Sequence, residues 1–498
     1  MYIDFGLDSL ALERSKEKIP VRWDSNEVVN GHMLLVGMSG AGKTFTLKRM
    51  VRSILDTAGQ SKPRIHIFDI HGDIDVEGAS HVRFSEQTDY GLNPLIVNPD
   101  PHFGGVRKRI QAFITTINKT SRQLGGKQEA VLRNILTELY ASFGFQANNP
   151  ASWVVEEVGD PDPIVIDGKL YLDVPITEKD EAKALGARWD GTEKCWYIAP
   201  DAYHGAITNW PMKTKGRRHP SINDALRHTN RLLRNAFLGT NSEALNKLEE
   251  FTRLSNAYQR KVLSTLKRGD RVELDEKSQA DLTKAGDKAI DAYKDYVASV
   301  KSGKELDDLI RYDSTDVMRS VLERLENLSG IGIFKSKAPP FDPNSPVWRY
   351  NLTALSMEER KLFVLFRLVE IFMAGVQRGE QSQILDIIVL DEAHAFIDDD
   401  PDNIINTIAK EARKFGIALI CASQNPTHFS DDFVSSVGTK VILGIDEMYW
   451  KSSSNKLNLG LDALEWIRLQ QTMQVQIKRK GQAKNDWNWT VIPRAQAA

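Results

Sequence analysis

The residues with the clearest chemistry form a short glycine-rich stretch, GMSGAGKT, which runs from Gly37 to Thr44. It matches the pattern G-x-x-x-x-G-K-[ST] at every fixed position, and it lies between an apolar run typical of a strand and a stretch typical of a helix. Glycines let backbone N–H groups face phosphate oxygens, and the positive end of the following helix faces them too. The stretch therefore predicts a nucleotide site. Its cofactor-binding residues are Gly37, Ser39, Gly40, Ala41, Gly42, Lys43, Thr44 and Phe45.

Two side chains of this stretch are expected to act on the nucleotide directly. Lys43 is predicted to contact the β- and γ-phosphates, and the Thr44 hydroxyl is predicted to bind a metal ion. The predicted cofactors are therefore ATP and Mg²⁺.

A pair of carboxylates far along the chain would complete the site. The run DIIVL, residues 386–390, is apolar enough for a strand buried on both faces of a parallel sheet, and Asp391 and Glu392 follow it. Open α/β sheets place their chemistry at the carboxyl ends of such strands. Asp391 is then predicted to hold Mg²⁺, and Glu392 to orient and deprotonate the attacking water. Taken alone, an Asp-Glu pair after a strand is equally typical of a helix N-terminus.

Further candidates lie on two other predicted strands. The strand in PRIHIFDIHGD is followed by His71 and Asp73, which we expect at the nucleotide edge. The strand in IALICASQNP ends near Gln424, a candidate sensor of the γ-phosphate. Arg413 lies on the predicted helix before that strand, which Gly416 ends. It is either a cation aimed at a γ-phosphate, in its own subunit or a neighbour's, or a surface cation that interacts favourably with the helix dipole.

In order and content, these motifs resemble the HerA/FtsK branch of hexameric P-loop ATPases, which also includes conjugation motors. The resemblance rests on GMSGAGKT, FDIHGD, LNPL, GIGIF, IIVLDEAHAF and EARKFGIALICASQNP, and it covers about residues 25–150 and 325–480. It implies an α/β fold with a RecA-like core and a mainly parallel sheet. It also implies ATP hydrolysis by a homo-oligomeric, hexameric ring that encloses double-stranded DNA, or another polymer, and pulls it through the pore.

The resemblance also carries over residue roles. Lys43, Thr44, Asp391 and Glu392 match the nucleotide residues of the branch, Gln424 matches its sensor, and Arg413 matches an arginine that contacts the nucleotide. One departure is visible at the start of the chain. HerA proteins usually carry a β-barrel before the phosphate loop, and only 36 residues precede Gly37 here, so we expect the barrel to be absent or replaced.

The long separation within the site indicates an insertion. Lys43 and Glu392 are 349 positions apart (392 − 43), more than one compact core needs. The predicted organisation is an N-terminal part of the core, a small α+β module with a basic linker, a helical subdomain, and a C-terminal part of the core, at residues 1–150, 151–219, 220–328 and 329–498.

Residues 164–200 resemble a small module of unknown function that recurs in mobile-element and DNA-processing proteins. Its aromatic residues Trp189, Trp196 and Tyr197 either form its core or stack on bases. Cations that could accompany stacking are Lys183, Arg188 and Lys194. The linker WPMKTKGRRHP either contacts phosphate or is solvated; its cations are Lys213, Lys215, Arg217 and Arg218.

Composition narrows the class of protein. The chain has 498 residues and a net charge of -2, which neither requires nor excludes a nucleic-acid partner. Cys195 and Cys421 are far apart and form no CxxC pair, which favours a reducing compartment. Apolar runs are much shorter than the ~20 residues of a membrane span. We therefore expect a cytoplasmic protein without a membrane partner.

Three functions are compatible with these features. The first is a ring-forming, double-stranded DNA translocase or helicase that acts with a partner effector or nuclease in genome defence, including antiviral defence, or in mobile-element processing. The second is an ATPase that moves protein or pilus components in secretion or conjugation. The third is a nucleotide-gated scaffold that assembles an effector.

Overall fold

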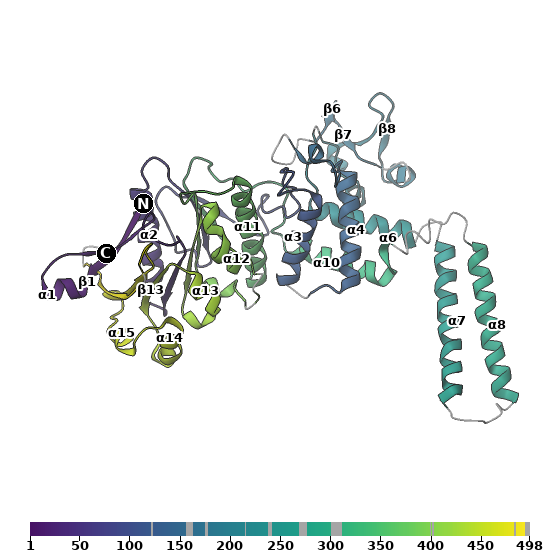
Figure 1. Cartoon of the computed structure of the whole chain (residues 1–498). Helices are drawn as coiled ribbons and strands as arrows, with labels where there is room; N and C mark the ends of the chain where they lie inside the picture. The colour runs from purple at the N-terminus through teal and green to yellow at the C-terminus, as the bar shows by residue number, and fades with distance from the viewer. Residues whose placement is uncertain are drawn as a thin grey trace. The chain divides into compact units, whose positions relative to one another are not determined.

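The computed structural model describes residues 1–120, 123–155, 163–174, 178–214, 216–237, 242–267, 276–299, 311–398, 400, 403–482 and 485–493. The chain divides into two compact units, and Figure 1 labels some of their elements. The core unit contains residues 1–123 and 331–498, and the inserted unit contains residues 124–157 and 161–330.

One sheet runs through the core unit. From β13 to β5 its strands are parallel, and the strands on the other side of β13 are antiparallel. The α/β class with a mainly parallel sheet is therefore confirmed. In sheet order the strands are β2 (Pro20–Asp24), β1 (Tyr2–Asp8), β15 (Trp487–Val491), β14 (Thr472–Ile477), β13 (Thr439–Gly444), β3 (Met33–Gly37), β12 (Ile417–Ser423), β11 (Asp386–Leu390), β4 (Arg64–Asp69), β10 (Val347–Asn351) and β5 (Ser80–Arg83).

The central strands follow from their composition. Every residue of β3 and β12 is buried, as expected for strands covered on both faces. The chain before the phosphate loop forms β1 and β2, which pair with each other and, through β15, extend the same sheet. In this chain, therefore, β1 and β2 add an antiparallel edge to the sheet.

Helices cover the sheet of the core unit. The apolar side of α2 packs on it through Leu47, Met50 and Val51, which join one hydrophobic cluster with β3 and β11. A capping box between Ser356 and Glu359 begins α11, the longest of these helices. The α-helices of this unit are α1 (Ser9–Arg14), α2 (Lys43–Thr57), α3 (Val106–Thr120), α11 (Met357–Arg378), α12 (Ile404–Glu411), α13 (Asp431–Ser436), α14 (Trp450–Leu457) and α15 (Leu461–Glu465).

The chain enters the inserted unit at Leu124, whereas the sequence placed this boundary after residue 150. The reason is α4 (Gly126–Ser142), which packs against two helices from the far end of the insertion. Those helices are α6 (Ile222–Phe237) and α10 (Thr315–Gly330). A helix adjacent in sequence to the core therefore belongs by packing to the insertion.

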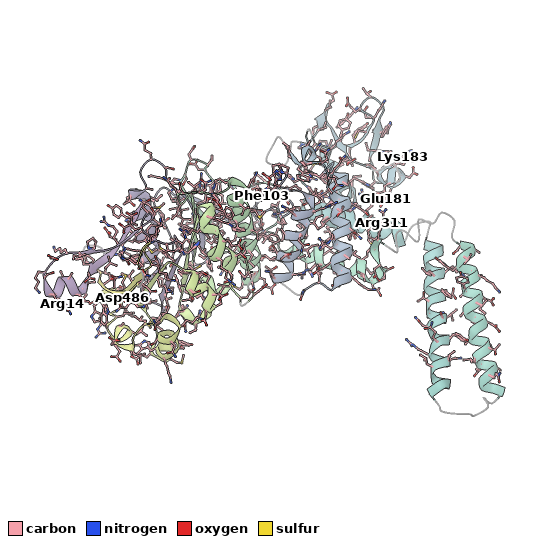
Figure 2. The ribbon with its side chains drawn as sticks, in the orientation of Figure 1. Arg14, Phe103, Glu181, Lys183, Arg311 and Asp486 are labelled. Atoms are coloured by element: carbon pink, nitrogen blue, oxygen red, sulfur yellow. The ribbon has the colours of Figure 1, made fainter. Side chains whose placement is uncertain are left out.

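The module of the inserted unit is a small antiparallel sheet with one helix. Its core includes Leu170, Leu172 and Trp210, while Trp196 packs at the margin and Trp189 is 54% exposed. The aromatic residues therefore divide between core and surface. In sheet order its elements are β6 (Val165–Ile166), β7 (Lys169–Leu172), β9 (Cys195–Ile198) and β8 (Arg188–Asp190), with α5 (Lys179–Ala184), whose Glu181 and Lys183 are labelled in Figure 2.

The basic linker is held by protein contacts. Arg218 forms a bidentate ion pair with Asp224, and Arg217 donates to the carbonyl of Ser152 at 2.6 Å. Arg217 is nevertheless exposed, and Lys215 lies outside the described residues, so the two predictions for this linker stay open. Beyond the linker, α7 (Ser242–Lys267) and α8 (Glu276–Ser299) pack side by side as a long helical hairpin (Figure 1).

A buried ion pair joins the N-terminal and C-terminal segments of the core unit. Arg349 on β10 donates to Asp69 on β4 through Nε at 2.8 Å and Nη2 at 2.7 Å, and it also donates to the carbonyl of Gly72. Asp69 accepts the backbone N–H groups of Gly72 and Ile74. Asp69 therefore shapes the loop after β4.

We expect Arg349→Met to lower the free energy of unfolding by about 3–5 kcal/mol, because Asp69 would remain charged and buried without its partner. Urea unfolding measures the change. Arg22→Met is the matched control, because Arg22 pairs with Asp4 at the surface, where solvent screens the pair. Equal effects of the two substitutions would contradict the assignment.

Candidate nucleotide site

The phosphate loop connects the end of β3 to the start of α2. Gly40 and Gly42 have φ angles of 78° and 90°, a backbone region that other residues rarely adopt. The Ala41 N–H donates to the carbonyl of Met38 at 3.1 Å, across the loop. Lys43 Nζ donates to the carbonyl of Gly37 at 2.9 Å. The loop is therefore curled, with Lys43 reaching back over it.

The carboxylates meet this loop at the same edge of the sheet. β12 lies between β3 and β11, and it pairs in parallel with both. Through Cys421 on β12, Leu390 is level with Leu34 on β3, so Asp391 and Glu392, which follow Leu390, approach the start of the phosphate loop. Lys43 Nζ lies 3.4 Å from Glu392 Oε1. The sheet thus brings together residues that are 349 positions apart (392 − 43).

Oxygen atoms suited to Mg²⁺ gather beside the loop. Thr44 Oγ1 donates to Asp73 Oδ2 at 3.1 Å, and Asp391 is 2% exposed. Burial and the nearby charges of Glu392 and Asp73 raise the pKa of Asp391 to about 6. A buried carboxylate in this setting favours a cation, and hydroxyl and carboxylate oxygens are the ligands that Mg²⁺ prefers. These residues therefore fit the predicted metal, and Asp73 is a further candidate ligand.

Glu392 has a different electrostatic environment from its neighbour. Burial alone would raise its pKa, but a hydrogen bond from His394 and the charge of Lys43 lower it to about 2. Its φ angle of 50° is uncommon for a residue with a side chain, so its backbone is constrained as well. Glu392 is therefore an ionised carboxylate aimed at the phosphate loop.

Two histidines form a cluster beside Glu392 that the sequence did not identify. His394 Nδ1 lies 3.2 Å from Glu392 Oε2, and the His394 ring is 4.8 Å from the His428 ring. Ser423 Oγ lies 3.1 Å from His428 Nδ1. The motif DEAHAF contained the signal for His394, whereas His428 reaches the site only through the fold.

The two remaining candidates, Gln424 and Arg413, lie at opposite ends of β12. Gln424 directly follows β12 at the carboxyl edge and is exposed. Arg413 lies in the turn Ala412–Phe415, before β12 begins, and is exposed at the amino edge. Because strands rise about 3.3 Å per residue, β12 separates Arg413 from its own phosphate loop by roughly 20 Å. Consistent with that position, burial and then the charge of Arg413 lower the pKa of His32, just before β3, to about 4.

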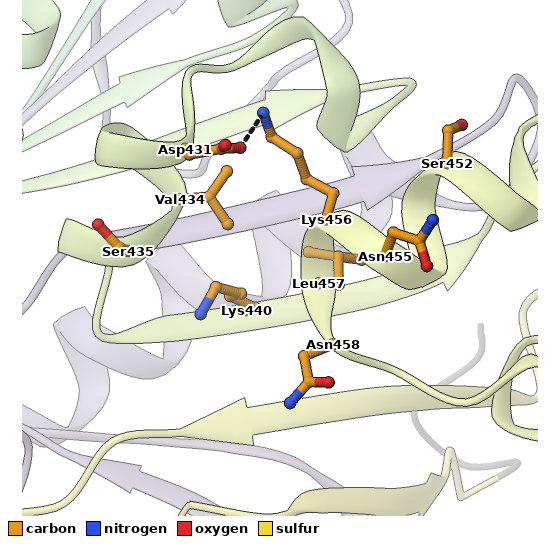
Figure 3. Close-up of a pocket in the computed structure, with 9 residues that line it drawn as sticks. All are labelled: Asp431, Val434, Ser435, Lys440, Ser452, Asn455, Lys456, Leu457 and Asn458. Carbon is orange, nitrogen blue, oxygen red and sulfur yellow. Dashed lines mark ion pairs between the residues drawn. The ribbon is translucent and has the colours of Figure 1, made fainter.

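A separate pocket of about 540 Å³ lies between α13, α14 and the start of β13 (Figure 3). Lys456 pairs there with Asp431 at 2.6 Å, and the buried Lys440 donates to Gln476. Lys440 is at the amino end of β13, whereas the phosphate loop meets the carboxyl end of that strand at Gly444. This pocket is therefore distinct from the nucleotide site.

Comparison with known proteins agrees with this geometry. Residues 11–153 match the family model of the central domain of the helicase HerA. An 83-residue segment is 35% identical to the DNA double-strand break repair helicase HerA of Pyrococcus furiosus, covering 15% of each chain. An 87-residue segment is 38% identical to a probable helicase of Methanocaldococcus jannaschii, covering 16% of each. The matched segments thus span about one-sixth of these relatives.

A solved structure shows the same fold over nearly the whole length of both chains. VirB4 of Thermoanaerobacter pseudethanolicus superposes with a TM-score of 0.54 and 14% identity, over 100% of this chain and 98% of that one. The segment that carries the phosphate loop is therefore similar to the central domain of HerA, and the chain has the fold of VirB4. The module at residues 169–211 matches a domain of unknown function, DUF5710, and a 42-residue segment is 48% identical to the DNA primase TraC of Escherichia coli, covering 8% of this chain and 4% of TraC.

We expect Asp391→Asn in this HerA-like core to gain stability relative to the wild type as pH rises. The pKa of Asp391 is about 6 in the folded chain and near 3.8 when unfolded, so folding favours the protonated form. Its stabilising contribution is complete below pH 3.8 and is lost as pH rises through 6, by on the order of 3 kcal/mol. The amide that replaces the Asp391 carboxyl group does not ionise, so the variant does not lose this stability as pH rises.

Urea unfolding of both proteins at pH 4.5 and pH 8 measures this effect without added metal. A stability difference that is the same at both pH values would contradict the predicted environment of Asp391.

Proposed function

We propose that the chain hydrolyses ATP as the subunit of a ring-forming motor that moves on double-stranded DNA. The observation that carries this proposal is the assembly of Lys43, Thr44, Asp73, Asp391 and Glu392 at one edge of one sheet. Charge on the phosphates, a metal site and an ionised carboxylate near the attacking water are the parts that phosphoryl transfer needs.

Each side chain of the site has a separate task in ATP hydrolysis. Mg²⁺, when bound, would neutralise charge on the β- and γ-phosphates. Lys43 places its charge on the β- and γ-phosphates. Glu392 orients the water and accepts its proton, with His394 holding the other carboxylate oxygen. Gln424, at the same edge, contacts the γ-phosphate or the water.

The position of Arg413 supports an ATP site that is formed by two neighbouring subunits. It is exposed at the edge of the sheet opposite its own phosphate loop. In a ring of identical subunits that join head to tail, opposite edges of neighbouring subunits face each other. We infer that Arg413 stabilises the γ-phosphate bound by the neighbouring subunit, and that the ring is a hexamer.

DNA is the proposed polymer because of the names of the relatives. The HerA relatives are described as DNA double-strand break repair helicases, and the relative matched over 42 residues is a DNA primase. Exposed Trp189, edge to face with Trp196 at 5.6 Å, offers an aromatic surface for a base. We assign any cutting of DNA to a partner effector or nuclease, and we place the system in genome defence or mobile-element processing.

The same fold also occurs in VirB4, so an ATPase that moves protein or pilus components is the second candidate. Stimulation of ATP turnover by duplex DNA separates the two. No helix in the described part of the chain is both long and apolar enough to cross a membrane. We propose that the chain works in the cytoplasm.

Glu392→Gln should bind ATP with the affinity of the wild type and lose about 10²–10⁴-fold in turnover, because the amide cannot accept the proton of the water. Fluorescent-nucleotide titration and steady-state phosphate release measure the two quantities. Lys43→Ala is the contrasting variant, since it should lose affinity itself. Wild-type turnover by Glu392→Gln would place the base elsewhere.

A mixing experiment tests the role of Arg413. Arg413→Ala and Lys43→Ala should each be inactive alone, because an arginine at the transition state contributes about 10³–10⁵ in rate. In mixed rings, an intact loop from one variant meets an intact arginine from the other. Random one-to-one mixing should restore about a quarter of the interfaces. No recovery, with both variants still assembling by native mass, would exclude action across the interface.

A further inference from the structure

A turn near the end of the chain contacts the phosphate loop. Gln470 lies in the connection between α15 and β14, and its side-chain Nε2 donates to the carbonyl of Gly40 at 2.9 Å. Its Cγ is 3.6 Å from the position that a Cβ on Gly42 would occupy. The Gln470 side chain therefore runs along the loop, although it is 430 positions away in sequence.

The turn holds Gln470 firmly in this position. Thr472 Oγ1 accepts the N–H of Arg468 at 2.7 Å and donates to the carbonyl of Trp466. Leu469 packs so closely on Gly444 that a Cβ there would lie 2.5 Å from its Cδ2. Gln470 itself has a φ angle of 63°, which is uncommon for a residue with a side chain. A strained backbone inside a well-anchored turn indicates that the placement of this side chain matters.

The contact determines which way one peptide group of the loop faces. In a trans peptide the C=O and the following N–H point in opposite directions. When Gln470 holds the Gly40 carbonyl on the outer side, the Ala41 N–H must point inward. The Ala41 N–H donates to the carbonyl of Met38, so this peptide group is held at both ends, by Gln470 and by Met38. The interior of such a loop is where backbone N–H groups meet phosphate oxygens.

We propose that Gln470 is a positioning residue that presets the phosphate loop to bind the β-phosphate of a nucleotide. This inference rests on the proposed function, because it assigns a task within the same ATP site. The side chain acts through the Gly40–Ala41 peptide, so the effect is the same before and during hydrolysis.

The inference has a kinetic signature. ADP and ATP share the β-phosphate, so loss of the Gln470 contact should weaken both by a similar factor. One hydrogen bond of this kind corresponds to about 3- to 10-fold in affinity. Because the contact is made equally in the ground state and the transition state, KM should rise while kcat stays within about twofold.

Gln470→Asn is the sharpest variant. Asparagine tolerates a positive φ and keeps an amide, but it is one methylene too short to reach Gly40. Gln470→Gly also removes the contact and relieves the backbone strain. Asn458→Ala is the matched control, because Asn458 has a φ of 48° in an exposed position after α14 and makes no contact with the phosphate loop.

Titration with ADP and with ATP, together with kcat, KM and the melting temperature, tests the inference. Both Gln470 variants should bind ADP and ATP about 3- to 10-fold more weakly, with an unchanged or higher melting temperature, and Asn458→Ala should bind like the wild type. Wild-type affinity in both Gln470 variants would overturn the inference and leave the proposed function standing. A fall in kcat without a change in affinity would also overturn it. Failure of the wild-type chain to bind either nucleotide would overturn the proposed function as well.

Discussion

Backbone hydrogen bonds hold β3, β12 and β11 in one parallel register, and the nucleotide site depends on that register. It places the end of β3 and the end of β11 at the same edge of the sheet, with one strand between them. The inserted unit begins after α3 and ends before β10, so it interrupts none of these strands. Its length therefore does not affect their pairing. The chemistry therefore needs only that the core strands pair correctly, which their buried, apolar composition strongly favours.

At this edge, two adjacent carboxylates have different electrostatic environments. Burial and the charges of Glu392 and Asp73 raise the pKa of Asp391 to about 6, whereas His394 and Lys43 lower that of Glu392 to about 2. One carboxylate is thus prepared for a metal ion, and the other is ionised and oriented toward the phosphate loop. Lys43 Nζ lies 3.4 Å from Glu392 Oε1 and so connects the phosphate loop to this carboxylate.

Local motifs predicted the parts of the site that are contiguous in sequence. Gly37 to Thr44 and the Asp391–Glu392 pair carry their signals in a few neighbouring residues, and so does the apolar pattern of the parallel strands. Contacts between distant residues were not predictable in this way. The task of Asp69 depends on Arg349, 280 positions away, and the Gln470 contact depends on a turn at the other end of the chain. The boundary at Leu124 likewise reflects packing of α4 on helices that follow much later.

We propose that each ATP site is completed by a neighbouring subunit, with Arg413 supplied across the interface. ATP turnover per chain, measured over a range of protein concentrations together with the native mass, tests it most directly. The account predicts that turnover per chain is minimal where the chain is monomeric and rises in step with ring formation. Constant turnover per chain from monomer to assembly would contradict it.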